Sequence, residues 1–347
     1  MAPLKGAMGR IDSLQALRAI AAATVMYWHI GSPLQRGLFG VDMFFVLSGF
    51  VISMVLVQTR PTALTFAIDR ITRIVPLYWL MTTLLFVAAS IDPSPFKPSI
   101  HEMGHYLRSL LFILYLKENG VRQPILSVGW TLTYEMIFYA VALVVFYLAR
   151  IRSPAANALA ITFMCIFGTL APGDSAVLQI LTSPLLLEFC FGIGVWYVYS
   201  AGVRCSALIS IVGIAVGLGL MIYLDVPVVK TQLEVVVKFG IPSTFVLFFT
   251  LNLESHLRAG LLKRMLIHLG DASYAVYLTH LFVVEFFRKL LPHLNSAWSI
   301  TTLYGVLFTM SVGLLVGSLV YVYVDAPLVA LARRLVRQRC AIPTSHA

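Results

Sequence analysis

Two ionisable residues interrupt the first apolar segment of the chain, in the run LRAIAAATVMYWH. Arg18 and His29 are eleven positions apart, close to three full turns of an α-helix, so their side chains share one helix face. They are separated along the axis by about 16 Å, too far for a direct contact but suited to one elongated ligand. Histidine titrates near neutral pH and often acts as a general base. The alternative is a snorkelling arginine and a histidine at the membrane interface.

Two acids stand at the membrane edge or inside other apolar runs. Asp42 lies near the start of GVDMFFVLSGF, and Glu135 lies within SVGWTLTYEMIFY. An acid at depth in an apolar helix needs a partner or a function, because an unpaired charge in the membrane is costly. A carboxylate can also orient a catalytic histidine. Asp42 and Glu135 are therefore our candidates for the acid that orients His29.

Two further pairs have helical spacing. Arg70 and Arg73, in RITRIVPLYW, share a helix face, and paired guanidinium groups suit phosphate recognition. Anchoring of the topology by basic residues is the competing interpretation of this pair. Tyr277 and His280 align in GDASYAVYLTH and are candidates for substrate contact. A hydrogen-bonded structural role for His280 fits its spacing equally well.

The composition predicts that these residues sit in a membrane protein. Of 347 residues, 59% are hydrophobic and only 12% are charged, with a mean hydropathy of +0.89. Soluble domains are about half apolar and about a quarter charged, so this chain has too little polar surface for a water-soluble globule. The net charge of +10 resides in short loops, which favours topology signals over nucleic-acid binding. The four cysteines lack CxxC spacing, so neither a zinc site nor a disulfide framework is indicated. We expect no metal and no permanently bound cofactor.

The fold class that follows is an all-α integral membrane protein with about ten transmembrane helices. A spanning helix needs about 20 mostly apolar residues. Basic residues are more frequent in the segments on the same side of the membrane as the N-terminus than in those on the opposite side. This distribution predicts that both termini are cytoplasmic. The organisation is one membrane domain over 1–332 and a short basic cytoplasmic tail over 333–347, with the longest loop, 92–127, outside as a connector or an acceptor-binding element. The expected spans are 12–31, 38–57, 75–91, 128–149, 156–172, 179–200, 206–225, 235–252, 272–290 and 301–325.

Five motifs in this order resemble the acyltransferase 3 family of bacterial membrane proteins. They are LRAIAAATVMYWH, GVDMFFVLSGF, RITRIVP, GWTLTYEMIFY and SYAVYLTH, and the resemblance covers essentially the whole chain. Within the family, PILSVGWTLTYEMIFY is most similar to the exopolysaccharide-production branch. Two positions depart from the family pattern, because Asp271 stands where a neutral or basic residue is expected and Asp325 where relatives more often have glutamate.

The resemblance implies a multi-pass O-acyltransferase of the bacterial inner membrane. Its co-substrate would be cytoplasmic acyl-CoA, with acetyl-CoA expected, and its acceptor a hydroxyl of an exopolysaccharide, of a lipid-linked precursor or of another cell-envelope glycan. The family's basic residue and histidine map onto Arg18 and His29, and its paired arginines onto Arg70 and Arg73.

The mechanism expected from this mapping runs along the first helix. The CoA phosphates would lie near Arg70 and Arg73, and the pantetheine arm would pass Arg18 towards His29. His29 would then act as a general base or carry the acyl group itself. A transporter or flippase of lipid-linked sugars remains the alternative, since buried ionisable groups in a ten-span bundle fit it equally well.

Overall fold

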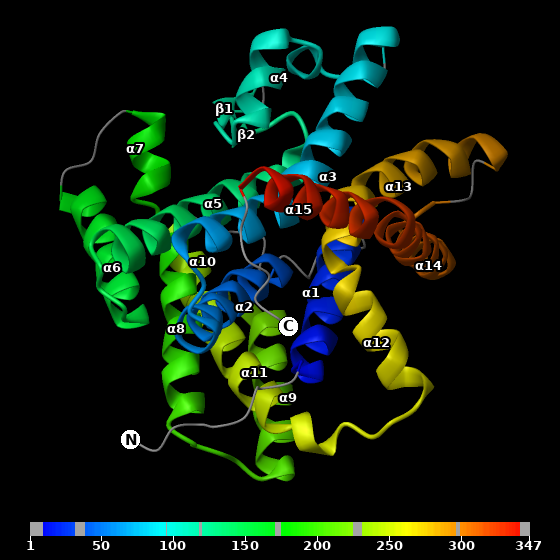
Figure 1. Cartoon of the computed structure of the whole chain (residues 1–347). Coiled ribbons are helices and arrows are strands. Elements are labelled where there is room, and N and C mark those ends of the chain that lie inside the picture. The colour runs from blue at the N-terminus through cyan, green and yellow to red at the C-terminus, as the bar shows by residue number, and fades with distance from the viewer. Residues whose placement is uncertain are drawn as a thin grey trace.

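The protein is described from a computed structural model that covers residues 10–31, 39–94, 96–117, 120–170, 175–224, 231–295 and 299–340. Over these residues the chain is a bundle of helices with one short antiparallel hairpin, which confirms the predicted all-α class (Figure 1). The hairpin pairs β1 (Tyr115–Leu116) with β2 (Arg122–Gln123). The helices are α1 Asp12–Ile30, α2 Gly40–Met54, α3 Ala63–Ile91, α4 Met103–Leu110, α5 Trp130–Leu143, α6 Pro154–Leu170, α7 Ala176–Leu181, α8 Leu187–Ser200, α9 Ala207–Leu224, α10 Gln232–Val235, α11 Ile241–Asn252, α12 Leu261–Asp271, α13 Ser273–Leu294, α14 Leu303–Val320 and α15 Ala326–Cys340.

Seven helical segments of the described chain are long and apolar enough to cross a membrane. The other three expected spans are also helices. Helix α6, with 17 residues, is slightly shorter than the others, and α1 and α13 carry polar residues that lower their mean hydropathy. The seven segments are Gly40–Thr59, Ala63–Ile91, Ser127–Leu148, Ala176–Ser200, Ala207–Leu224, Gln232–Asn252 and Leu303–Val336.

Helix α1 packs against α2, α12, α13 and α14 and so lies inside the bundle. Its first turn is capped by a residue distant in sequence, because the Glu254 carboxylate accepts from the backbone N–H of Asp12 at 3.0 Å and of Ser13 at 2.7 Å. A carboxylate at a helix N-terminus satisfies free N–H groups and complements the helix dipole. At the other end, Gly31 takes a left-handed conformation with φ of 75°, as helix-terminating glycines commonly do. Both ends of α1 are therefore fixed.

Helices α2 and α8 pack with their backbones almost in contact. A Cβ atom at Gly49 would lie 2.0 Å from the Phe189 carbonyl oxygen, and one at Gly192 would lie 2.0 Å from the Val46 carbonyl oxygen. Small residues permit such close helix approach in membrane proteins. This contact fixes α2, which also packs against α1, to α8.

The segment between α3 and α5 folds into a cap at one end of the bundle, where α4 and the β1–β2 hairpin lie together in Figure 1. Tyr78 and Trp79 of α3 hold α4 by donating to the carbonyls of Ser109 and Leu110, at 3.0 and 2.8 Å. The Ser109 hydroxyl in turn accepts from the Ile125 N–H at 2.8 Å. The predicted loop 92–127 is thus an ordered element in its described residues.

The α2–α8 contact predicts a large difference between two glycines of one helix. Gly192→Ala should lower the thermal unfolding temperature of the purified protein in lipid nanodiscs, because overpacking a close contact costs about 1–3 kcal/mol. Gly194→Ala is the matched control: its Cβ would have no atom within 4 Å, so it should unfold at the wild-type temperature or above. Equal unfolding temperatures for the two variants would contradict the packing.

Candidate functional site

A cavity of about 360 Å³ lies beside the N-terminal half of α1 and is lined by several basic side chains. We call it the arginine cavity. Glu135 is the one acid among its lining residues in the described chain. Many guanidinium groups around one carboxylate leave an excess of positive charge, which suits an anionic ligand with several phosphates. The arginines that line it are Arg10, Arg18, Arg70, Arg73 and Arg333.

The arginines differ in how far their hydrogen bonds are already used. Arg18 donates from Nε to the Ser273 hydroxyl at 3.2 Å. Arg70 places its guanidinium about 6 Å from the rings of Phe66 and Tyr139, and its buried Nε has no hydrogen-bond partner in the described structure. A buried donor without a partner is costly. Arg70 therefore has hydrogen-bonding capacity left for a ligand.

Two arginines at the rim of this cavity are held by ion pairs. Arg10 contacts Asp271 at 2.7 Å, and Arg333 on α15 lies 3.5 Å from Asp69. Sequence reasoning missed both of them, because neither belongs to a spaced motif and they are more than 300 positions apart. They are partly exposed, so their pairs are screened and contribute little stability.

Glu135 belongs to the arginine cavity and not to the surroundings of His29. Its Oε1 accepts from the Ser48 hydroxyl at 3.2 Å and from the Tyr139 hydroxyl. Tyr139 is one helical turn after Glu135, at the spacing that brings side chains together. The structure therefore gives Glu135 a place among the arginines and does not support it as the acid that orients His29.

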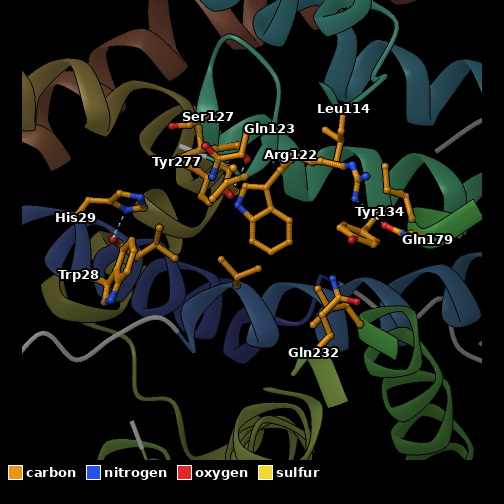
Figure 2. Close-up of a pocket in the computed structure, with 18 residues that line it drawn as sticks. Trp28, His29, Leu114, Arg122, Gln123, Ser127, Tyr134, Gln179, Gln232 and Tyr277 are labelled. Atoms are coloured by element: carbon orange, nitrogen blue, oxygen red, sulfur yellow. Dashed lines mark hydrogen bonds between the residues drawn. The ribbon is translucent and has the colours of Figure 1, made fainter. Parts of the chain in front are cut away.

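A second, larger cavity of about 820 Å³ lies at the other end of α1, beside the hairpin. We call it the histidine cavity. Figure 2 shows His29 and Trp28 at one end of it and Gln179 and Gln232 at the other. Aromatic rings with polar edges and amide groups that both donate and accept are suited to a polyhydroxylated ligand. Further polar or aromatic side chains that line this cavity are Arg122, Gln123, Ser127, Trp130 and Tyr134.

His29 is held in this cavity by two neutral partners. Its Nδ1 lies 2.9 Å from the Val25 carbonyl oxygen and 3.2 Å from Nε2 of His280. The Nδ1 atom of His280 lies 2.7 Å from the Tyr277 carbonyl oxygen. A carbonyl only accepts, so in neutral rings both Nδ1 atoms carry the proton and Nε2 of His280 accepts from His29. We infer from this hydrogen bonding that Nε2 of His29 has a free lone pair, as a general base requires.

His280 itself is fully buried, with 0% of its surface exposed, and lines neither cavity. The expectation that it contacts substrate is therefore not supported, because His29 and Tyr277 lie between it and the cavities. Its hydrogen bonds fit the other interpretation, a histidine that positions another group. The signal for this role was present in its spacing from Tyr277, but its partner is 251 positions away.

Asp42 does not reach either cavity. It is 3% exposed, near the start of α2, and its electrostatic neighbour is Glu188 at the start of α8. Glu188 is also fully buried, and its side chain packs over Gly240. The two acids lie between packed helices, so the structure does not support Asp42 as the group that orients His29.

Tyr277 stands between the cavities. It and Val41 are the two described residues that line both of them. The Tyr277 hydroxyl lies 2.8 Å from the Thr131 hydroxyl and donates to the Val128 carbonyl oxygen at 3.0 Å. The two cavities therefore adjoin at Val41 and Tyr277.

A protein-family model described as an acyltransferase domain matches residues 11–322. The exopolysaccharide production protein ExoZ of Rhizobium meliloti (strain 1021) is 31% identical over 322 residues, which cover 87% of this chain and 93% of that protein. The acyltransferase MdmB of Streptomyces mycarofaciens is 27% identical over 94% of this chain and 93% of its own length.

A third relative matches over a shorter part. The peptidoglycan O-acetyltransferase OatA of Listeria monocytogenes is 26% identical over 164 residues, which are 42% of this chain and 26% of that protein. No solved structure matches the chain.

Proposed function

The chain belongs to the acyltransferase 3 family, and from this membership we propose that it transfers an acyl group from cytoplasmic acyl-CoA to a hydroxyl of an exopolysaccharide or another cell-envelope glycan. The observation that carries the proposal is the pair of cavities that meet at Val41 and Tyr277. One has the charge for a nucleotide with phosphates, and the other has the rings and amides for a sugar. In this proposal α1, α6 and α13 complete ten spans of the bacterial inner membrane, with both termini in the cytoplasm.

The donor would occupy the arginine cavity. A CoA thioester carries three phosphate groups at one end and the reactive carbonyl at the end of a long, nearly uncharged arm. Arg70 and Arg73 would bind the phosphates, with Arg10 and Arg333 at the rim. The arm would pass Arg18 along the face of α1 towards His29, a distance of about 16 Å.

His29 would act as the general base on the acceptor hydroxyl. Its free Nε2 takes the hydroxyl proton as the oxygen attacks the thioester carbon; the carbon–sulfur bond breaks, the new ester bond forms, and the proton passes to the departing thiolate. His280 would position His29 by accepting from its Nδ1. The same Nε2 would serve an acyl-histidine intermediate, but direct transfer needs fewer steps in a site where both cavities adjoin Tyr277.

Replacing His29 tests the proposed general base. Purified wild-type protein in nanodiscs should release thiol from acetyl-CoA when cell-envelope glycans are added, and His29→Gln should lower this rate about 10²- to 10⁴-fold, the usual contribution of a general base. Thiol release measured with a chromogenic disulfide checks it, with the unfolding temperature as the control for folding. Full activity in His29→Gln would remove His29 from the chemistry. No release by the wild type with several acyl-CoAs and acceptors would favour the transporter.

Positioning by His280 predicts a difference between two replacements. His280→Leu removes one of the two acceptors of the His29 Nδ1 proton and leaves only the Val25 carbonyl, so the ring is held less firmly. We expect kcat to fall about tenfold, the effect of one lost hydrogen bond, with KM for both substrates little changed. His280→Gln keeps a side-chain carbonyl that accepts from His29, so it should recover part of kcat. A role in packing alone would make the two variants equally impaired in kcat and in unfolding temperature.

The donor site predicts a change in KM. The double variant Arg70→Ala, Arg73→Ala should raise KM for acetyl-CoA tenfold or more, because each hydrogen bond to a charged group contributes about 1.5–3 kcal/mol. Its KM for acetyl-pantetheine, which lacks the phosphates, should stay near the wild-type value. Arg334→Ala is the control, since Arg334 is exposed and lines neither cavity. An unchanged KM for acetyl-CoA in the double variant would exclude these arginines from the donor site.

A further inference from the structure

Tyr277 occupies the place where a donor arm would have to leave the arginine cavity and enter the histidine cavity. It lines both cavities together with Val41, yet only 6% of its surface is exposed. Thr131, which its hydroxyl contacts at 2.8 Å, lines the arginine cavity, and Val128, which accepts from it, lines the histidine cavity. The phenol therefore bridges the walls of the two cavities.

The Tyr277 ring is fixed by packing, in addition to the hydrogen bonds of its hydroxyl. Phe44, which lines the arginine cavity, packs edge-on against Tyr277 with ring centroids 6.0 Å apart. Thr131 also lies 3.1 Å from the Val128 carbonyl oxygen, so its hydroxyl proton can be donated either to that carbonyl or to the Tyr277 hydroxyl oxygen. To open a passage between the two cavities, the Tyr277 hydroxyl must exchange these hydrogen-bond partners for others. A ligand that enters between the cavities can supply them.

Tyr277 also lies between the two functional contacts of α13. On the same face of that helix, Ser273 accepts from Arg18 and His280 accepts from His29, with Tyr277 one turn from each. The Tyr277 backbone carbonyl accepts the Nδ1 proton of His280. A ligand that moves Tyr277 therefore enters directly beside the histidine pair.

We propose that Tyr277 is the partition that keeps the acyl thioester away from water in the histidine cavity until the donor arm displaces it. This inference rests on the proposed function. Water competes with the acceptor hydroxyl for the same carbonyl carbon: its attack breaks the carbon–sulfur bond and yields a carboxylic acid and free thiol. Because the Tyr277 side chain contacts both cavity walls, the thioester can enter the histidine cavity only when a bound donor arm displaces Tyr277. Acyl-CoA is then consumed mainly by transfer to the acceptor and less by hydrolysis.

The test compares thiol release without acceptor to acyl transfer with acceptor. Tyr277→Phe keeps the ring but loses both hydrogen bonds of the hydroxyl, and Thr131→Val removes one partner with little change in shape. Each should raise the ratio of acceptor-independent thiol release to transfer about fivefold, the population change for one net hydrogen bond. Tyr277→Ala, which removes the ring, should raise it further.

Tyr274→Phe is the matched control. Tyr274 lies on the same helix and lines the arginine cavity alone, and its hydroxyl donates to the Ile74 carbonyl oxygen at 2.6 Å. This variant also loses one tyrosine hydrogen bond, but it should leave the ratio unchanged because it does not face the histidine cavity.

The outcomes of this test distinguish failure of the Tyr277 proposal from failure of the acyltransferase proposal on which it rests. A wild type that releases thiol, with Tyr277→Phe and Thr131→Val lowering both rates in parallel, would overturn the partition and leave the acyltransferase proposal standing. A wild type that releases no thiol from any acyl-CoA would overturn both. If Tyr277→Ala fails to fold, the two milder variants still decide the question.

Discussion

Along the contact between α1 and α13, Arg18 meets Ser273 at one end and His29 meets His280 at the other. The two helices therefore run in the same direction, each with its N-terminal half at the arginine cavity. This parallel contact fixes the spacing between a cationic and a basic group inside an apolar bundle, where unpartnered ionisable groups are costly. It is supported from outside by the Glu254 cap on α1 and by Gly270, where a Cβ would lie 2.1 Å from the Gln15 carbonyl oxygen.

Among the ten expected spans, the two helices that carry this contact have the composition least suited to lipid. The segments that meet the length and hydropathy of a membrane span in the described chain do not include α1 or α13. In the N-terminal half of α13, Ser273 and His280 face α1, whereas Glu285 and Arg288 nearer the C-terminal end are exposed. Helices α9 and α14 instead expose apolar side chains at the surface of the bundle, such as Leu208, Ile211 and Leu315.

Local periodicity was enough to predict the all-helical class and which residues of a helix share a face. The shared face of Arg18 and His29, the Arg70–Arg73 pair and the alignment of Tyr277 with His280 all follow from helical spacing. The side chains of five of these six residues, all but His280, line the two cavities, with Arg18 in the arginine cavity and His29 in the histidine cavity. Partners distant in sequence were not predictable. Asp42 and Glu135 were plausible partners of His29 by residue type, but α2 turns Asp42 towards Glu188 and α5 turns Glu135 towards Tyr139. The amides of the histidine cavity come from three separate elements and follow no sequence pattern.

The neutral partner of His29 distinguishes this site from a histidine held by a carboxylate. In the triad arrangement, a buried acid stabilises the imidazolium that forms as the histidine takes a proton. Here His280 and the Val25 carbonyl fix the ring by hydrogen bonds without adding a negative charge. A carboxylate beside His29 would repel the oxyanion that develops on a thioester carbonyl during attack, and it would bury a further charge in the bundle. Glu135 meets neither difficulty in the arginine cavity, where cations surround it. In the proposed mechanism, the acid is therefore kept apart from the base.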